Sequence, residues 1–306
     1  MNQKMKKVLV SVLLAVTILC AAVVGVVVYQ QTHKGGSPEI EKVWDGVTKI
    51  APTGSGTEQD PYIISRPAHL AYVATEIEDY QENTYYSITE DLDMGKYEWF
   101  SIGSASNPFS GVVNANQHNV FRIGSDAVDY YSDKASQSLF GYIENAEIND
   151  LFVVYTGVQL NKQADWGGIA TWAKNSTINR SANLTATLLI DNNETNTIGN
   201  NYGGLIATAE GGVAINNSYN MTTLSYAGVG NAIGGLIGEV KGENNLIKNS
   251  FNAGEIIAQD ITNLGMIIGL DSENVEMENT ISQFGTSGDI ATTDADWQTF
   301  VTNSKI

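Results

Sequence analysis

Short apolar runs separated by glycine, asparagine, serine and threonine dominate the chain beyond residue 138, and few of them keep the 3.6-residue period of a helix. Five runs, SLFGYI, GGIATW, GGLIAT, GGLIGE and LGMIIG, align on Leu139, Ile169, Leu205, Leu236 and Met266, with spacings of 30, 36, 31 and 30 residues. Most units carry a second strand-like patch about ten residues later, beginning at Ile148, Ile178, Ile215 and Ile247. An internal repeat of this length predicts stacked coils.

The residues at the unit boundaries favour the same fold. Paired glycines stand at Gly167-Gly168, Gly203-Gly204 and Gly234-Gly235, where they permit a positive φ or a close approach of backbones. Recurring asparagines suit left-handed turns or ladders of side-chain amides between coils. We therefore predict an all-β fold, a right-handed β-solenoid (β-helix), in which each unit buries its apolar face against the next.

Two short helices are expected at the ends of this solenoid. Between Arg66 and Tyr80, apolar residues recur at helical spacing at Leu70, Val73, Ala74 and Ile77. A second helix is expected at about residues 294–302, with Trp297, Phe300 and Val301 on its apolar side. Helices at both ends would cover strand edges that could otherwise pair with other chains.

The N-terminus carries a different pattern. Lysines precede an apolar stretch from Val8 to Val28 that is long enough to span a bilayer, which predicts one transmembrane helix with a cytoplasmic N-terminus and an extracellular ectodomain. A cleaved signal peptide is the alternative. The single cysteine, Cys20, lies in this stretch, so the exported part has no intramolecular disulfide; lipid attachment at Cys20 is the other interpretation.

These patterns divide the chain into six parts. They are a cytoplasmic N-terminus (1–7), a transmembrane anchor (8–28), a stalk or linker (29–53), an N-terminal cap with the first coils (54–137), the repeats (138–285) and a C-terminal cap (286–306).

The net charge of −18 excludes one class of partner. With 34 acidic against 16 basic residues, the surface repels nucleic acid and anionic lipid head groups. The charge suits the solubility of an exposed ectodomain, and binding of cations or polycationic partners is the functional alternative.

The repeats resemble a known group of sequences. GGLIG at Gly234–Gly238, followed by KNSFNAGEI at Lys248–Ile256, is similar to the GLUG motif of bacterial surface proteins, and residues 54–123 resemble the segment that often precedes it. The resemblance implies a right-handed β-solenoid at the cell surface, in proteins often involved in adhesion, some of which carry a separate peptidase domain. No HExxH zinc-protease signature is present, so peptidase activity does not carry over from the resemblance.

Candidate metal ligands are few. Asp91 and Asp93, two residues apart, place both carboxylates on one face of a strand, and Ca²⁺ is the cation that they would suit. A solvated strand end is the alternative. His33, His69 and His118 lack zinc-ligand spacing, and we expect a structural hydrogen bond from His118.

Aromatic residues recur through the repeats and provide the candidate binding surface. We expect Trp166, Trp172, Tyr202, Tyr219 and Tyr226 to include exposed contacts for a cell-surface protein or glycan, with Trp172 and Tyr202 the first choices. Because no acid, base and nucleophile converge in the sequence, we expect a protein that is not an enzyme, with no catalytic residues and no cofactor. A carbohydrate-active β-helix enzyme, a polysaccharide lyase or hydrolase, is the alternative function.

Overall fold

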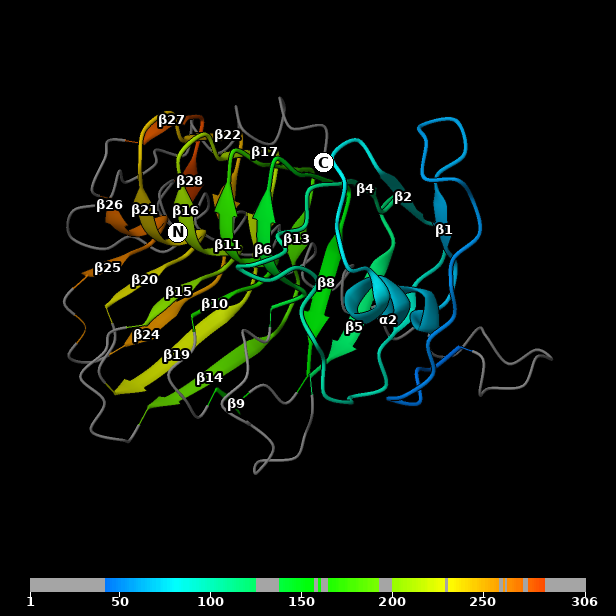
Figure 1. Cartoon of the computed structure of the whole chain (residues 1–306). Helices are drawn as coiled ribbons and strands as arrows, with labels where there is room; N and C mark the ends of the chain where they lie inside the picture. The colour runs from blue at the N-terminus through cyan, green and yellow to red at the C-terminus, as the bar shows by residue number, and fades with distance from the viewer. Residues whose placement is uncertain are drawn as a thin grey trace, which may run out of the picture. The chain divides into compact units, whose positions relative to one another are not determined.

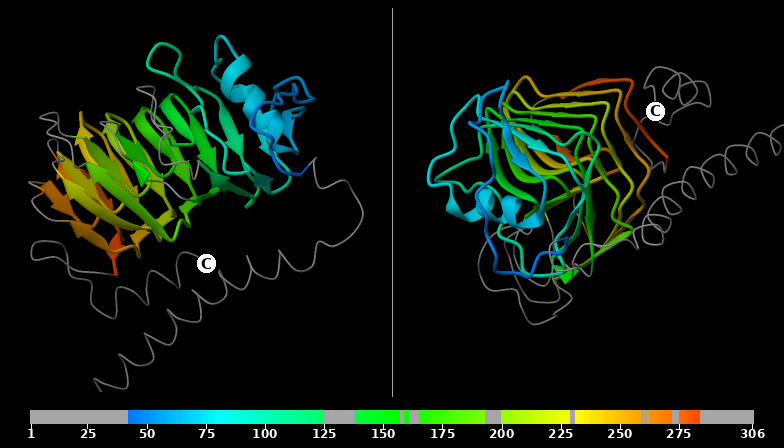
Figure 2. Two further views of the ribbon diagram at one scale, coloured as in Figure 1. Left: turned by 90° about the horizontal axis from the view of Figure 1, so that it is seen from below. Right: turned by 90° about the vertical axis from the view of Figure 1, so that its right-hand side faces the viewer.

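The computed structural model describes residues 42–124, 138–156, 159–160, 165–192, 200–228, 231–258, 261, 263–271 and 275–283. Within these ranges the chain winds through parallel strands that stack coil upon coil, with α2 at the N-terminal end (Figures 1 and 2). The expected transmembrane helix at 8–28 and the cap at 286–306 lie outside the described residues. Within the described ranges no helix is long and apolar enough to cross a membrane.

Each regular coil contributes one strand to each of five sheets, which we number in the order in which one coil visits them. Sheet I contains β10 (Trp166–Gly167), β15 (Asn201–Gly203), β20 (Ala232–Gly234) and β25 (Asn263–Gly265). Sheet II contains β6 (Phe140–Glu144), β11 (Ala170–Lys174), β16 (Ile206–Glu210), β21 (Ile237–Lys241) and β26 (Ile268–Asp271).

The remaining three sheets complete the coil. Sheet III contains β1 (Tyr62–Ile64), β2 (Tyr85–Ile88), β4 (Val112–Asn114), β7 (Glu147–Asn149), β12 (Thr177–Asn179), β17 (Ala214–Asn216), β22 (Leu246–Lys248) and β27 (Glu276–Glu278). Sheet IV contains β3 (Leu92–Asp93), β5 (Asn119–Ile123), β8 (Phe152–Tyr155), β13 (Ala182–Asn183), β18 (Tyr219–Asn220), β23 (Phe251–Asn252) and β28 (Ile281–Ser282). Sheet V contains β9 (Gln159–Leu160), β14 (Thr187–Asn192), β19 (Thr223–Gly228) and β24 (Ile256–Ala258).

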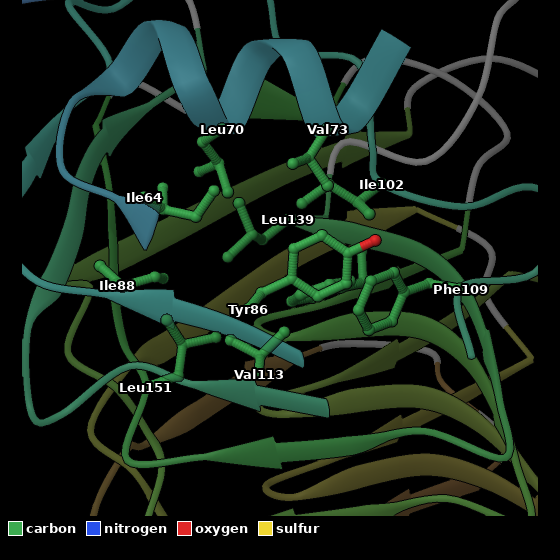
Figure 3. Close-up of a pocket in the computed structure, with 11 residues that line it drawn as sticks. Ile64, Leu70, Val73, Tyr86, Ile88, Ile102, Phe109, Val113, Leu139 and Leu151 are labelled. Carbon is green, nitrogen blue, oxygen red and sulfur yellow. The ribbon is translucent and has the colours of Figure 1, made fainter. Parts of the chain in front are cut away.

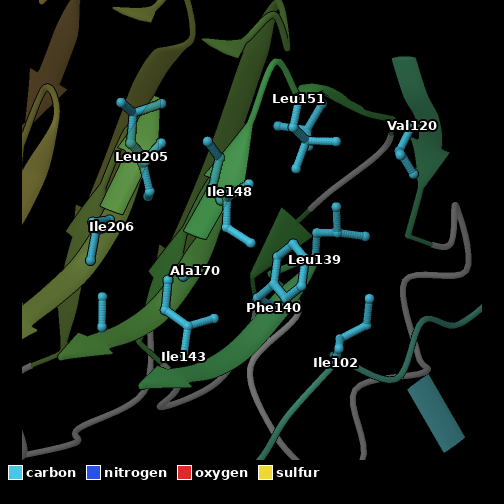
Figure 4. Close-up of a cluster of buried hydrophobic side chains, with 14 of the residues drawn as sticks. Ile102, Val120, Leu139, Phe140, Ile143, Ile148, Leu151, Ala170, Leu205 and Ile206 are labelled. Atoms are coloured by element: carbon cyan, nitrogen blue, oxygen red, sulfur yellow. The ribbon is translucent and has the colours of Figure 1, made fainter. Parts of the chain in front are cut away.

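The expected β-solenoid is confirmed, and so is the register of its second patch, because Ile148, Ile178, Ile215 and Ile247 align in sheet III and are fully buried. These isoleucines belong to a continuous core inside the coils (Figure 4). The right hand of the solenoid stays a prediction. One detail of the alignment was wrong: Leu236 pairs with Ile267 rather than Met266, so the glycine that follows in the fifth unit is Gly269.

The paired glycines serve close packing rather than a positive φ. A Cβ on Gly235 would lie 2.0 Å from the carbonyl oxygen of Met266 and 2.3 Å from Nδ2 of Asn252. The positive φ angles occur instead at the turns that link sheets II, III and IV, at residues such as Asn145, Asn175 and Asn217. Close approach of backbones therefore occurs at the paired glycines, whereas left-handed turns occur at asparagines elsewhere in the coil.

The N-terminal end is covered as expected, by α2 (Pro67–Glu76), which starts with Pro67 in its first turn and buries Leu70 and Val73. The folded part begins earlier than residue 54. Trp44 is buried, and its backbone N–H donates to the carbonyl oxygen of Asp93. Its indole packs edge-on against Trp99, so Trp44, within the segment 29–53 expected to form a stalk, contacts the solenoid.

Candidate functional site

One outward-facing row of side chains crosses sheet II from coil to coil. Tyr142, Trp172, Thr208, Glu239 and Leu270 occupy equivalent positions on β6, β11, β16, β21 and β26. Because strands in neighbouring coils are about 4.8 Å apart, side chains in such a row contact one another. The row changes along its length from aromatic to polar, and both parts have features of a binding site.

The aromatic part consists of Tyr142 and Trp172, which we call the platform. Their ring centroids are 5.5 Å apart with an interplanar angle of 38°, and both side chains are partly exposed. Nε1 of Trp172 donates to Oε2 of Glu210 at 3.1 Å, which fixes the indole. Lys174 and Glu144 form an ion pair of 3.5 Å on the same face. The platform is therefore a held aromatic surface edged by polar groups.

Beside this row, sheet I folds toward the outer face of sheet II. A Cβ on Gly203 or Gly234 would lie 1.8 Å from the carbonyl oxygen of Ile206 or Ile237, respectively. Only glycine, which has no Cβ, lets a strand of sheet I and the following strand of sheet II approach each other this closely. Outward side chains of sheet I consequently point across the outer face of sheet II, and we call this place the corner.

The corner holds a network of polar side chains from adjacent coils. Nδ2 of Asn201 donates to Oγ1 of Thr208 at 3.0 Å and to Oε2 of Glu239 at 2.6 Å. The same Oε2 forms an ion pair of 2.9 Å with Nζ of Lys241. Oδ1 of Asn201 accepts from Nδ2 of Asn231 at 2.9 Å. Every polar atom of the Asn201 side chain is thus engaged, and Asn201, Thr208 and Glu239 are buried.

Asp165 adds a carboxyl group to the corner. Its Oδ1 accepts the backbone N–H of Asn201 at 2.8 Å. Burial raises the pKa of Asp165, and the nearby charge of Glu239 raises this pKa further, while Lys241 and the Asn201 N–H oppose the shift. A carboxyl group that resists ionisation beside a paired carboxylate is a feature found at functional sites.

The structure separates the five expected aromatic residues into two groups. Trp166, Tyr202 and Tyr226 are buried, with exposed fractions of 0%, 1% and 4%. The exposure expected of Tyr202 is therefore wrong, because its ring points into the core and contacts Tyr226 at 5.3 Å. Trp172 and Tyr219 point outward from different sheets, so the set does not form one surface.

Tyr219 lies on the outer face of sheet IV, away from the platform. Its ring stacks on Phe251 with centroids 4.8 Å apart and an interplanar angle of 2°. Burial against this neighbourhood raises the pKa of the Tyr219 hydroxyl. The contact role expected of Tyr219 and Trp172 stays a prediction.

The two candidate calcium ligands are engaged by neighbouring side chains. Oδ1 of Asp91 accepts from the backbone N–H of Asn119 at 2.8 Å and lies 3.2 Å from Nδ1 of His118, the structural hydrogen bond expected of this histidine. Both oxygens of Asp93 contact the guanidinium of Arg122. In the part of the chain that the structure describes, no three His, Cys, Asp or Glu side chains are grouped to hold a metal ion.

The internal cavity beneath α2 is a packing gap. It measures about 10 Å³ and is lined by apolar side chains, including Leu70, Val73 and Leu139 (Figure 3). A water molecule needs about 10–15 Å³ and several polar partners. The cavity is therefore too small and too apolar for a ligand.

Sequence reasoning missed Tyr142 and the residues of the corner. Asn201, Glu239 and Lys241 lie far apart in the sequence and meet only because coils stack and sheet I folds toward sheet II. Aligning the repeat units residue by residue would place Tyr142 at the same position as Trp172. The sequence therefore contained a signal for this aromatic pair.

Comparison with known proteins supports the fold. No family model matches the chain, so the GLUG resemblance is not shown by that comparison, and no curated protein matches. A crystal structure from Bacteroides ovatus, described as a "putative immunoglobulin A1 protease", has a TM-score of 0.52 and 18% identity, over 79% of this chain and 83% of that one. A structure described as "IgA1 Protease" has a TM-score of 0.37 and 17% identity, over 78% of this chain and 20% of that one.

At 18% identity the first similarity establishes a shared β-solenoid fold. It also corrects the expectation that the chain is not an enzyme. A protein with this fold is described as a protease, so neither the solenoid nor the lack of a familiar sequence motif excludes catalytic activity.

Proposed function

We propose that the chain is an extracellular recognition solenoid that binds an extended glycan along the outer face of sheet II. The observation that carries this proposal is the platform, in which Tyr142 and Trp172 present partly exposed rings from adjacent coils. Aromatic faces contact the C–H faces of sugar rings, and flanking carboxylates and amines bond to the hydroxyl groups. Glu210, Glu144 and Lys174 stand where such groups are needed.

The scaffold supports tight binding because it is ordered before the ligand arrives. Trp172 is held by Glu210 on one side and by Tyr142 on the other. Little side-chain entropy is lost when a ligand contacts residues that are already fixed. Successive coils repeat the outward position, so the surface suits a chain-like ligand.

The charge of the surface indicates which glycans are favoured. Near the platform, Lys174 is paired with Glu144, and Glu210 faces Trp172. Together with a net charge of −18, this arrangement favours a neutral or amino-containing glycan over a sulfated or uronic-acid polymer.

The test measures binding of neutral oligosaccharides by calorimetry to the wild-type chain, to Trp172→Ala and to Tyr142→Ala. We expect each substitution to weaken binding by about tenfold or more, because truncating a central aromatic contact costs about 1–3 kcal/mol. Tyr219→Ala, on the outer face of sheet IV, is the comparison variant: unchanged binding would assign the glycan to the platform, whereas weakened binding would extend the contact to sheet IV. Equal binding by Trp172→Ala, with an unchanged circular dichroism spectrum, would remove the platform from the proposal.

The second candidate function is the binding or hydrolysis of a protein. The description of the Bacteroides ovatus structure as a protease favours this candidate. The experiment is incubation of the purified chain with immunoglobulin A1, followed by electrophoresis and a binding measurement. Cleavage would establish a protease, whereas binding without cleavage would indicate a protein-recognition module. Release of oligosaccharide products in the glycan assay would instead support the carbohydrate-active enzyme.

We further propose that residues 8–28 anchor the solenoid in the membrane with the repeats outside the cell. A retained anchor predicts that the native protein fractionates with membranes and keeps its N-terminal residues. Mass spectrometry of the N-terminal peptide distinguishes this form from one that starts near Ala21 or Tyr29.

A further inference from the structure

One carboxylate oxygen in the corner contacts both an amine and a carboxamide. Oε2 of Glu239 lies 2.9 Å from Nζ of Lys241 and 2.6 Å from Nδ2 of Asn201. The two nitrogen atoms therefore cannot be further apart than the sum of these distances. Such proximity gives an intramolecular reaction a large advantage over the same reaction between separate molecules.

We propose that Lys241 and Asn201 become joined by an intramolecular isopeptide bond, with Glu239 transferring the protons. Glu239 accepts a proton from the Lys241 ammonium, and the neutral Nζ attacks Cγ of Asn201. The C–N bond to Nδ2 then breaks, and the departing nitrogen receives a proton from Glu239. The remaining proton leaves with the released ammonia as ammonium, so the reaction needs no oxidant, cofactor or second substrate.

The surrounding contacts suit each stage of this reaction. Asn231 donates a hydrogen bond to Oδ1 of Asn201, the oxygen on which negative charge develops when the amine attacks. Oγ1 of Thr208 accepts from Nδ2 of Asn201 and so orients the group that leaves. These are positioning residues, whereas Glu239 contacts both reacting groups.

Burial shields the reacting carboxamide and the glutamate from water. The exposed fractions of Asn201 and Glu239 are 5% and 7%, so little water reaches the carboxamide carbon and competes with the amine for it. The side chain of Lys241 is 51% exposed, which leaves a path by which ammonia can depart.

Other lysine–carboxylate pairs in the described residues lack this arrangement. Lys49 pairs with Glu76 at 2.7 Å, Lys174 with Glu144 at 3.5 Å and Lys248 with Glu278 at 2.6 Å, and none of these pairs shows a hydrogen bond from an asparagine side chain to the glutamate. Glu239, in contrast, accepts from both a lysine and an asparagine side chain. The geometry is therefore particular to the corner and not a general result of stacking acidic coils.

The bond would connect β15 of sheet I with β21 of sheet II in the following coil. Stacked coils otherwise adhere through noncovalent contacts, namely parallel backbone pairing, apolar packing and side-chain hydrogen bonds such as that between Asn220 and Asn252. A covalent cross-link restricts the unfolded chain and resists sliding of one coil over the next. This is useful in a protein that has no disulfide in its repeats.

The test is peptide mapping of the purified full-length chain under denaturing conditions. Trypsin should fail to cut at Lys241 and should yield residues 181–248 with a mass lower by one ammonia molecule. Digestion with a glutamate-specific protease, which cuts at Glu210, should leave the Asn201 and Lys241 fragments attached to each other. Nearly complete linkage is expected, because both reacting groups already contact Glu239.

Three variants separate the chemistry from the fold. Lys241→Arg keeps the ion pair with Glu239 but cannot form the bond, and Asn201→Ala and Glu239→Gln should also yield unlinked peptides. Lys174→Arg is the matched control on the same sheet and should remain linked. A wild-type peptide that has its full mass and is cut at Lys241 would overturn the proposal. Linkage that persists in Glu239→Gln would also overturn it, because Glu239 would then not transfer the protons. Neither result bears on glycan binding by the platform.

Discussion

The side-chain amide of Asn220 donates a hydrogen bond to Oδ1 of Asn252 at 2.9 Å, with both side chains fully buried inside the solenoid. Each asparagine also closes a turn of its own coil, since the backbone N–H of Thr222 donates to Asn220 and that of Gly254 donates to Asn252. These polar side chains in sheet IV face the paired glycines, where no Cβ stands in their way. The interior asparagines and the glycine pairs are therefore two parts of one packing arrangement.

The first prediction concerns this inner ladder. Asn220→Ala should lower the free energy of unfolding by about 2–4 kcal/mol, because it leaves buried backbone groups without partners. Asn179→Ala on the outer face of sheet III is the control. Asn179 also bonds to asparagines in both neighbouring coils, but water can replace those contacts, so its loss should cost about 1 kcal/mol or less. Urea denaturation of both variants measures the difference, and equal losses would contradict the argument.

The second prediction compares two glycines with different roles. Gly235→Ala should destabilise the protein by about 2–4 kcal/mol, since its Cβ would collide with a backbone oxygen and with Asn252. Gly211→Asn should change stability by about 1 kcal/mol or less, because Gly211 has a φ of 64° that asparagine tolerates and a Cβ would make an ordinary contact of 3.7 Å with the carbonyl oxygen of Glu243. Asn175 already adopts a φ of 44° at the equivalent turn of the preceding coil. Thermal unfolding distinguishes the two, and a stable Gly235→Ala variant would refute the close-packing role.

The third prediction is a pH dependence that arises from Asp165. Because its folded-state pKa is raised, the folded state holds the proton more tightly than the unfolded state does. The stability contributed by protonation is complete below the unfolded pKa of about 3.9 and is lost as pH rises through the folded pKa. Asp165→Asn keeps an acceptor for the Asn201 N–H and removes the ionisation, so it should be more stable than the wild type at neutral pH. That advantage should vanish in acid, which melting curves at several pH values would show.

The repeat spacing was sufficient to predict the solenoid, because period and register are fixed by apolar positions such as Ile178 and Ile215 that must align to be buried. The direction of each aromatic side chain was not predictable in the same way. Trp166 and Trp172 are only six residues apart, but a sharp bend between β10 and β11 sends the first into the core and leaves the second outside. That bend depends on glycine contacts with the next coil, which a single unit does not reveal.

The corner was even less accessible from the sequence. Its hydrogen bonds connect different coils, and the spacing between units varies, so the distance in sequence between Asn201 and Glu239 follows no rule that a motif could capture. The misaligned fifth unit has the same origin, because the neighbouring apolar residues Met266 and Ile267 both satisfy the pattern and only the backbone pairing distinguishes them.

The last prediction concerns the final described coil. Ile247 and Met277 occupy equivalent inward positions on adjacent strands of sheet III, but Ile247 is fully buried and Met277 is 43% exposed. Ile247→Ala leaves a cavity between two coils and should cost about 2–5 kcal/mol. Met277→Ala should cost about 1 kcal/mol or less, because much of its side chain already contacts solvent. Urea denaturation of the full-length chain measures both variants. A large loss for Met277→Ala would instead mean that another segment of the chain, or a partner, covers this residue in solution.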